Sequence, residues 1–200
     1  MEILKIVPFI SFLAFAAILY FRVWQLQKKG IRLWSKQRKK KQSMYLLFPL
    51  FGLLLFVWLF EVIRAAFQFS TTILPKLLTY KLIESIFPEV FGTVLVLFSL
   101  VLFWVTLNHF NTSLRFGLAK NNKGKLVTSG IFSMSRNPFF LSLGIYFLGV
   151  VLILPCLYLL VFTLAAFVGI HCFILKEERF MYENYGEEYN NYAKTVRRYF

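Results

Sequence analysis

Four long apolar runs dominate this chain. They cover residues 3–24, 44–66, 88–110 and 139–175. Each of the first three has about 22 residues, enough for a helix to cross a hydrocarbon core of about 30 Å. Hydrophobic residues make up 58% of the chain and charged residues 16%, whereas a soluble domain has about 25% charged residues. We therefore expect an all-α integral membrane protein, and we exclude disorder, a disulfide scaffold and most soluble folds.

The fourth run is nearly twice as long as one span, and Pro155 lies at its centre. Proline breaks the interior of a helix, so we expect a tight hairpin of two helices, 139–153 and 157–175. The alternative is one kinked helix about 55 Å long, which would protrude from the bilayer. With the hairpin, the chain has five transmembrane helices.

The basic residues lie between the apolar runs. Residues 25–43 contain no acid but carry Lys28, Lys29, Arg32, Lys36, Arg38, Lys39, Lys40 and Lys41. The positive-inside rule places this connection in the cytoplasm, together with residues 111–137 and the tail from 176, and it places the N-terminus outside. The net charge of +14 is explained by topology, so we expect no nucleic-acid partner. We expect a multi-pass protein of a bacterial inner membrane.

The connections are expected to contain structure of their own. The connection at 111–137 is long, and loops of that length are usually functional; its turn is expected at 121–124. The tail at 176–192 is expected to be helical, with an interruption at Gly186. In the outer connection, aliphatic residues at helical spacing predict a short interfacial helix: Leu74, Leu77, Leu78, Leu82 and Ile83.

Ser135, Arg136, Asn137 and Pro138 form a segment with two interpretations. Asn is a preferred N-cap and Pro is preferred at the first helical position, so the segment is typical of a helix start. Alternatively, Arg136 and the free backbone N–H groups of the helix start bind an anionic or polar ligand.

Glu177 and Glu178 directly follow the last apolar run. At a helix C-terminus two carboxylates are unfavourable, so either the helix continues or a cation holds the pair. Arg136 and Arg179 could supply that charge, or a ligand's ammonium or ribose hydroxyls could occupy the carboxylates. A solvated helix face is the alternative. His171 lies two turns before Glu178 on the same helix face, and no residue pattern predicts a metal site.

The C-terminal half resembles the isoprenylcysteine carboxyl methyltransferase family, part of a wider group that includes phospholipid N-methyltransferases. The resemblance rests on four motifs in order. They are residues 126–132 (LVTSGIF), residues 136–140 (RNPFF), the pair Glu177–Glu178, and residues 185–189 (YGEEY) followed by Tyr192. It implies a methyltransferase core (111–200) made of a cofactor loop, the hairpin and a C-terminal helix. The three N-terminal transmembrane helices expected from the apolar runs (1–110) precede this core.

The resemblance also implies S-adenosylmethionine (SAM) bound at the cytoplasmic face and a lipophilic or isoprenoid acceptor that reaches the site from the membrane lipids. The implied cofactor-binding residues are Lys125, Leu126, Val127, Phe132, Arg136, Asn137, Pro138, Phe139, Phe140, Glu177 and Glu178. Arg136 suits the methionyl carboxylate, the glutamates suit the ribose or the ammonium, and Phe132 and Phe140 suit the adenine. No catalytic residue and no metal are assigned.

Two other functions remain open at this stage. An NADPH-dependent membrane reductase of the sterol-reductase type would need cations for the 2′-phosphate, and Lys120, Lys123 and Lys125 could supply them. A non-enzymatic lipid-binding or transport protein would not depend on Glu177 and Glu178.

Overall fold

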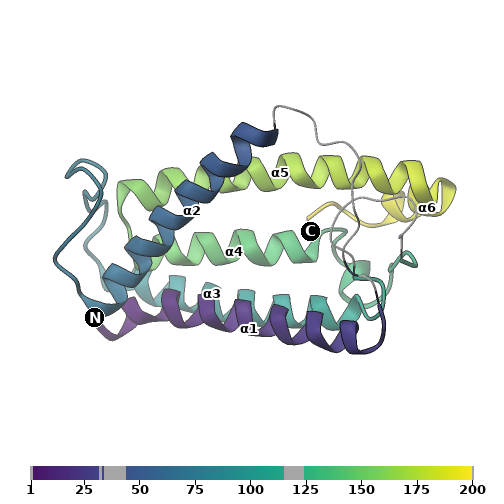
Figure 1. The fold of residues 1–200 in the computed structure, drawn as a ribbon, viewed down its shortest axis with the longest axis horizontal. Helices are drawn as coiled ribbons and strands as arrows, with labels where there is room; N and C mark the ends of the chain where they lie inside the picture. The colour runs from purple at the N-terminus through teal and green to yellow at the C-terminus, as the bar shows by residue number, and fades with distance from the viewer. Residues whose placement is uncertain (1, 32, 34–43, 115–123, 200) are drawn as a thin grey trace.

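The computed structural model describes residues 2–31, 33, 44–114 and 124–199. In this part of the chain all regular elements are helical, apart from one isolated bridge between Lys81 and Cys156. The elements are, in order, η1 (Glu2–Ile6), α1 (Val7–Lys28), α2 (Met44–Phe67), α3 (Ile86–His109), η3 (Gly130–Ser133), α4 (Pro138–Ile153), α5 (Leu157–Tyr185) and α6 (Glu187–Thr195) (Figure 1).

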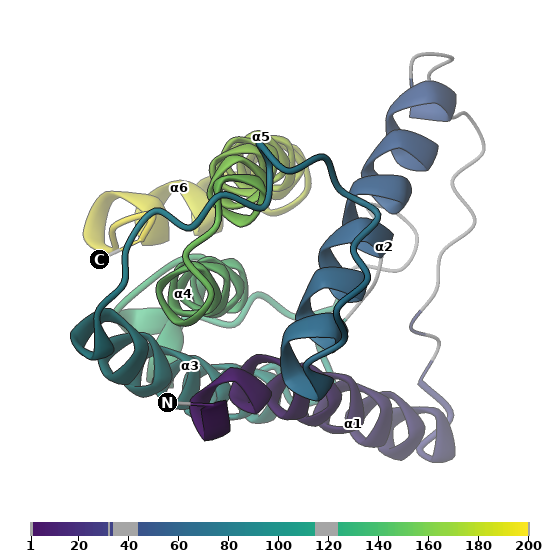
Figure 2. The same cartoon turned by 90° about the vertical axis from the view of Figure 1, so that its left-hand side faces the viewer.

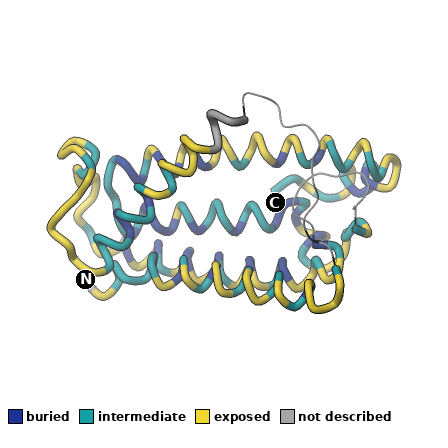
Figure 3. The backbone as a smooth tube through the Cα atoms, viewed as in Figure 1, coloured by how far each residue is buried: buried dark blue, intermediate teal, exposed yellow. Residues whose placement is uncertain are grey.

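The long helices have the length and surface of membrane spans. Four candidate spans are long and apolar enough to cross a membrane, and α4 is a shorter apolar helix of 16 residues. Exposed residues follow the outer faces of the bundle (Figure 3), and large apolar side chains such as Phe87 and Phe91 are among them. An apolar exterior on helices of this length is typical of a protein whose solvent is lipid. The chain is an all-α integral membrane protein.

The predicted hairpin is confirmed. Helix α4 ends at Ile153, Pro155 lies in the turn, and α5 begins at Leu157. The single kinked helix is wrong because the chain reverses direction at this proline and α5 returns beside α4 (Figure 1).

The interfacial helix predicted in the outer connection is wrong. Residues 68–85 form turns, one of them closed by Leu78 N–H donating to the carbonyl of Pro75 (2.9 Å). The backbone instead pairs with the hairpin turn: Tyr158 N–H donates to Leu78 O (2.9 Å) and Leu82 N–H donates to Pro155 O (2.8 Å). The first N–H groups of a helix have no partner within it. The connection satisfies two of those at the start of α5, since Leu157 N–H also donates to the carbonyl of Tyr80 (3.2 Å). This use of its carbonyls outweighs the helical spacing of its side chains.

Helices α3 and α4 pack most closely in the bundle, through two glycines. A Cβ at Gly92 would lie 2.6 Å from the carbonyl oxygen of Gly149, and a Cβ at Gly149 would lie 2.7 Å from that of Gly92. Small residues allow the backbones of membrane helices to approach in this way. Helix α2 is tilted relative to the other long helices (Figure 2), and Tyr158 of α5 donates a hydrogen bond to its Leu54 carbonyl (2.7 Å).

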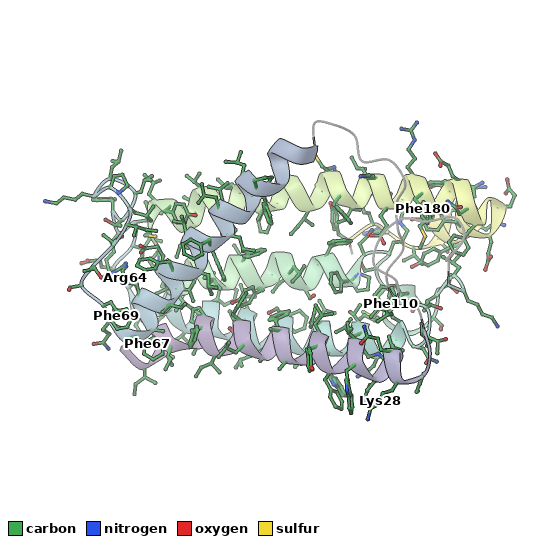
Figure 4. All side chains as sticks on the ribbon, in the orientation of Figure 1. Lys28, Arg64, Phe67, Phe69, Phe110 and Phe180 are labelled. Atoms are coloured by element: carbon green, nitrogen blue, oxygen red, sulfur yellow. The ribbon has the colours of Figure 1, made fainter. Side chains whose placement is uncertain are left out.

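The helix ends gather the connections on two sides of the bundle. In Figure 4, Lys28, Phe110 and Phe180 lie at one end, while Arg64, Phe67 and Phe69 lie at the other. The first end also carries the start of α4 and the whole of α6 (Figure 1), so the described parts of the connections predicted to share one membrane face lie at the same end of the bundle. Most of the predicted basic cluster lies outside the described residues (Arg32, Lys36 and 38–41), as do the turn residues 121–123 and Lys120.

Candidate functional site

Glu178 is the centre of a buried polar cluster at this end of the bundle. The residue is 5% exposed, and its carboxylate accepts hydrogen bonds or ion-pair contacts from three side chains. Arg198 binds both oxygens, with Nε 3.1 Å from each and a terminal nitrogen 2.9 Å from Oε2. A terminal nitrogen of Arg136 lies 3.3 Å from Oε1, and Asn137 Nδ2 donates to the same oxygen at 3.2 Å. The cluster joins the start of α4, the last turns of α5 and the C-terminal tail.

Both of the structural explanations offered for the glutamate pair, a continuing helix and a neutralising cation, apply. Helix α5 continues to Tyr185, so the pair is not at a helix end, and cations hold Glu178. Of the two cations expected, Arg136 is present. Arg179 is not: its side chain is 84% exposed and lies 3.8 Å from Glu183. The second cation is Arg198, which the sequence analysis missed.

The Arg136–Pro138 segment starts α4 as predicted, with Asn137 at the N-cap and Pro138 in the first turn. The side chain of Asn137 makes no capping hydrogen bond. Its amide donates instead to Glu178 and, at 3.2 Å, to the carbonyl of Arg198. Asn137 thus occupies the N-cap position, but its side chain connects α4 to α5 and to the tail instead of capping the helix.

The C-terminal tail, residues 196–199, runs back from α6 toward the start of α4 (Figure 1). Arg136 N–H donates to the carbonyl of Arg197 (3.0 Å), and Ser135 Oγ donates to that of Arg198 (3.3 Å). Further along, the hydroxyl of Tyr199 lies 2.5 Å from Nδ1 of His171. The tail is therefore attached to both arms of the hairpin.

Helix α6 is attached to η3. The buried hydroxyl of Tyr192 donates to the carbonyl of Phe132 at 2.6 Å. The ring of Phe132 is itself buried and meets the ring of Phe110, at the end of α3, with centroids 4.8 Å apart. Gly130 begins η3 with φ of +64° and has His109 directly over it. These contacts fix the predicted LVTSGIF motif between α3 and α6.

The remaining predicted residues are less tightly joined. Lys125 is exposed, and Leu126 and Val127 are half-buried in a segment without regular secondary structure. That segment is tied to α5 at its start, where the hydroxyl of Tyr185 donates to the carbonyl of Gly124 (2.6 Å). It lies in the same end of the bundle as the Glu178 cluster.

The aromatic residues expected to flank an adenine have separate neighbours. Phe140 meets Phe139 and Phe173, each with centroids 5.4 Å apart, whereas Phe132 meets Phe110. Among the described residues no ring contact joins Phe132 to Phe140. The structure therefore does not bring these two rings into one stack.

The electrostatics follow from burial beside one carboxylate. The hydrogen bonds that the Arg198 guanidinium donates to Glu178 raise its pKa above the ordinary value. Burial, with Glu178 adding to it, raises the pKa of Tyr189. Burial also raises the pKa of Tyr192 to about 12, against the opposing effect of Arg136. Both phenols therefore remain neutral around pH 7.

Two polar groups, one in the cluster and one next to Glu178 in sequence, have unused capacity. Nε of Arg136 is buried and has no hydrogen-bond partner among the described residues. The half-buried Glu177 likewise makes no hydrogen bond or ion pair within them. A buried donor without a partner costs free energy, so a ligand with an acceptor group would be stabilised there. In the part of the chain that the structure describes, no three His, Cys, Asp or Glu residues come together to hold a metal ion.

The fold and the cluster define a multi-pass helical membrane protein with a charged site at the ends of its last two apolar helices. The family model for phospholipid methyltransferases matches residues 87–188. The chain belongs to this family, which is part of the isoprenylcysteine and phospholipid methyltransferase group. No curated protein matches the chain. Family membership indicates a membrane methyltransferase and agrees with the predicted family, whereas the reductase and transport alternatives have no support from it.

Proposed function

We propose that this protein is a SAM-dependent methyltransferase that acts at the cytoplasmic membrane face on a lipophilic acceptor. The observation that carries the proposal is the unpartnered, buried Nε of Arg136, held next to Glu178 at the start of α4. When bound, SAM supplies a methyl group on a sulfonium, which is already an activated leaving group. The protein then has to bind the cofactor and the acceptor, orient them toward each other and exclude water from the site.

The unpartnered groups of Arg136 and Glu177 suit the amino-acid end of SAM. Arg136 offers its unpartnered Nε to the carboxylate. Glu177 is the carboxylate free to accept from the ammonium or from the ribose hydroxyls. Glu178 was expected to share that role, but its oxygens already accept hydrogen bonds from Arg198 and Asn137 and form an ion pair with Arg136. We therefore assign Glu178 to holding Arg136 and Asn137 in place.

The rest of the core would enclose the remainder of the cofactor. We propose residues 111–200 as the methyltransferase core and residues 1–110 as its membrane support. The segment at 125–127 and the rings of Phe132 and Phe140 lie on either flank of the Arg136–Asn137 turn in sequence. The rings would exclude water from the reacting groups. This part of the proposal rests on the family motifs.

The acceptor is proposed to be a lipophilic molecule that reaches the site from the bilayer beside α4 and α5. A carboxylate or thiolate needs only alignment with the methyl group, whereas an amine must first lose a proton. We assign no base among the described residues, and we attribute to the protein only the alignment of the reactants and the exclusion of water. The family supports a lipid-type acceptor.

Calorimetry with S-adenosylhomocysteine (SAH) on detergent-purified protein tests the cofactor. We expect the wild type to bind, and we expect Arg136→Ala and Glu177→Gln each to weaken binding roughly tenfold or more, as loss of a charged hydrogen bond should. Glu183→Gln is the matched control, because Glu183 is exposed and pairs only weakly with Arg179 (3.8 Å). A wild type that does not bind SAH would refute the proposal.

Transfer of radiolabelled methyl from SAM in membranes tests the acceptor. Membranes with and without the protein are incubated and then extracted for lipids. Label in the lipid extract that depends on the protein supports a lipophilic acceptor. Label found only in protein or in a water-soluble product contradicts it.

A further inference from the structure

We propose that Arg198 is a positioning residue of this site: it neutralises Glu178 so that the guanidinium of Arg136 stays free for the cofactor carboxylate. The inference rests on the proposed function and extends it to a residue outside the segment that matches the family, which ends at 188. It assigns a role to the C-terminal tail, which packs across the hairpin.

The hydrogen bonds of Glu178 are unequally shared between the two arginines. Arg198 makes the close, two-pronged contact, with distances of 3.1, 3.1 and 2.9 Å. Arg136 makes one longer contact of 3.3 Å through a terminal nitrogen. Two-pronged arginine–carboxylate pairs are the stronger kind. Glu178 is therefore satisfied mainly by the tail.

This division explains why Arg136 has a donor without a hydrogen-bond partner although its side chain is buried. Its side chain is only 10% exposed, yet its Nε has no partner among the described residues. If Arg198 were absent, Glu178 would be a buried carboxylate with one cation nearby. Arg136 would then turn its fork toward Glu178, because an incompletely paired buried charge is costly, and its donors would no longer face a ligand.

The backbone holds Arg198 in the position that this role requires. Its carbonyl accepts from Asn137 Nδ2 (3.2 Å) and Ser135 Oγ (3.3 Å), and the carbonyl of Arg197 accepts from the Arg136 N–H (3.0 Å). The residue before Arg136 and the residue after it are thus both attached to Arg198. A charged side chain held at both its backbone and its guanidinium is pre-organised for its partner.

The test compares two ligands that differ at the amino-acid end. SAH carries the carboxylate and ammonium, whereas 5′-methylthioadenosine lacks both. Affinities of both ligands are measured by calorimetry for the wild type, Arg198→Ala, Arg198→Lys, Arg136→Ala and the Arg136→Ala/Arg198→Ala double variant. Arg179→Ala is the matched control, because Arg179 adjoins Glu178 in sequence but is exposed. General damage to the fold would weaken both ligands equally.

We expect Arg198→Ala to bind SAH roughly tenfold or more weakly, with Arg198→Lys intermediate and 5′-methylthioadenosine affinity within about twofold of the wild type. Because Arg198 acts through Arg136, adding Arg198→Ala to Arg136→Ala should cause little further loss. Unchanged SAH affinity, an equal loss for both ligands, or fully additive losses in the double variant would each overturn the inference. Failure of the wild type to bind SAH would instead refute the proposed function on which it rests.

Discussion

Asn137 and Glu178 are joined side chain to side chain, with Nδ2 3.2 Å from Oε1, although 41 residues separate them in the sequence. The contact links the N-cap of α4 to the last turns of α5. Both residues are buried, so the amide replaces water as a donor to the carboxylate. The polar site therefore depends on the two arms keeping their register.

Replacing Asn137 with Asp should destabilise the protein. The change removes a donor and places a second carboxylate next to Glu178, at a cost of about 2 kcal/mol or more. The measurement is the thermal unfolding temperature in detergent. Asn190→Asp is the control, because the side-chain amide of Asn190 donates to exposed Glu187 at 3.4 Å. An Asn137→Asp protein as stable as the wild type would show that this contact does not hold the hairpin arms.

Gly130→Ala should lower both stability and SAH affinity. Gly130 has φ of +64°, which costs about 1–2 kcal/mol for an alanine, and its Cβ would overlap the ring of His109. Adding His109→Ala should recover only the steric part of the loss, since the backbone strain remains. Gly52→Ala is the control, because nothing lies within 4 Å of a Cβ there. Complete recovery in the double variant would contradict the strain argument.

Gly149→Ala should separate α3 from α4. Its Cβ would lie 2.7 Å from the carbonyl oxygen of Gly92 and 2.8 Å from a methyl of Val96, so one helix must shift, at about 1–3 kcal/mol. Unfolding in detergent is the measurement. Gly169→Ala on α5, where nothing lies within 4 Å, should change stability by less than about 1 kcal/mol. Equal effects of the two substitutions would rule out close packing as the cause.

Alkaline pH should weaken the contact between α6 and η3 through Tyr192. Burial raises the pKa of Tyr192 from 10.0 to about 12, so the folded protein keeps this proton while the unfolded chain loses it. The contribution of this raised pKa to the free energy of unfolding is fully present below pH 10 and is lost as the pH rises through 12. Between these pH values the free energy of unfolding falls by about 1.4 kcal/mol per pH unit.

Tyr192→Phe isolates this contribution. At pH 7 it should cost about 1–2 kcal/mol, because the carbonyl of Phe132 loses its donor. Between pH 10 and 12 its stability should fall less steeply than that of the wild type. Unfolding measured at several pH values gives both quantities, and Tyr182→Phe, with an exposed ring, is the control at pH 7. Identical pH slopes for wild type and Tyr192→Phe would contradict the assignment.

Features that depend on near neighbours in the chain could be predicted. The apolar runs predicted the long helices, and Pro155 predicted the hairpin because a proline cannot donate to a helix. The helical tail is interrupted at Gly186, as predicted, and this residue has φ of 54°. The Asn137–Pro138 pair predicted the start of α4, and the order of the motifs predicted the family.

Contacts between distant segments could not be predicted from the same patterns. The helical spacing of Leu74, Leu77 and Leu78 was misleading, because the backbone of that connection pairs with the hairpin turn. Arg179 adjoins Glu178 but points away, whereas Arg198 reaches it after the chain has turned back. A basic residue in the tail was the only signal for Arg198, and this chain has many basic residues.

The sequence by itself determined that this protein is a helical membrane protein, where its helices turn and which family it belongs to, because hydrophobic length, proline and short motifs act locally. Only the tertiary structure decided which cations neutralise Glu178 and which donor of Arg136 is left unpaired. That choice depends on distances between chain segments brought together by folding, since a buried carboxylate pairs with the donors nearest in space.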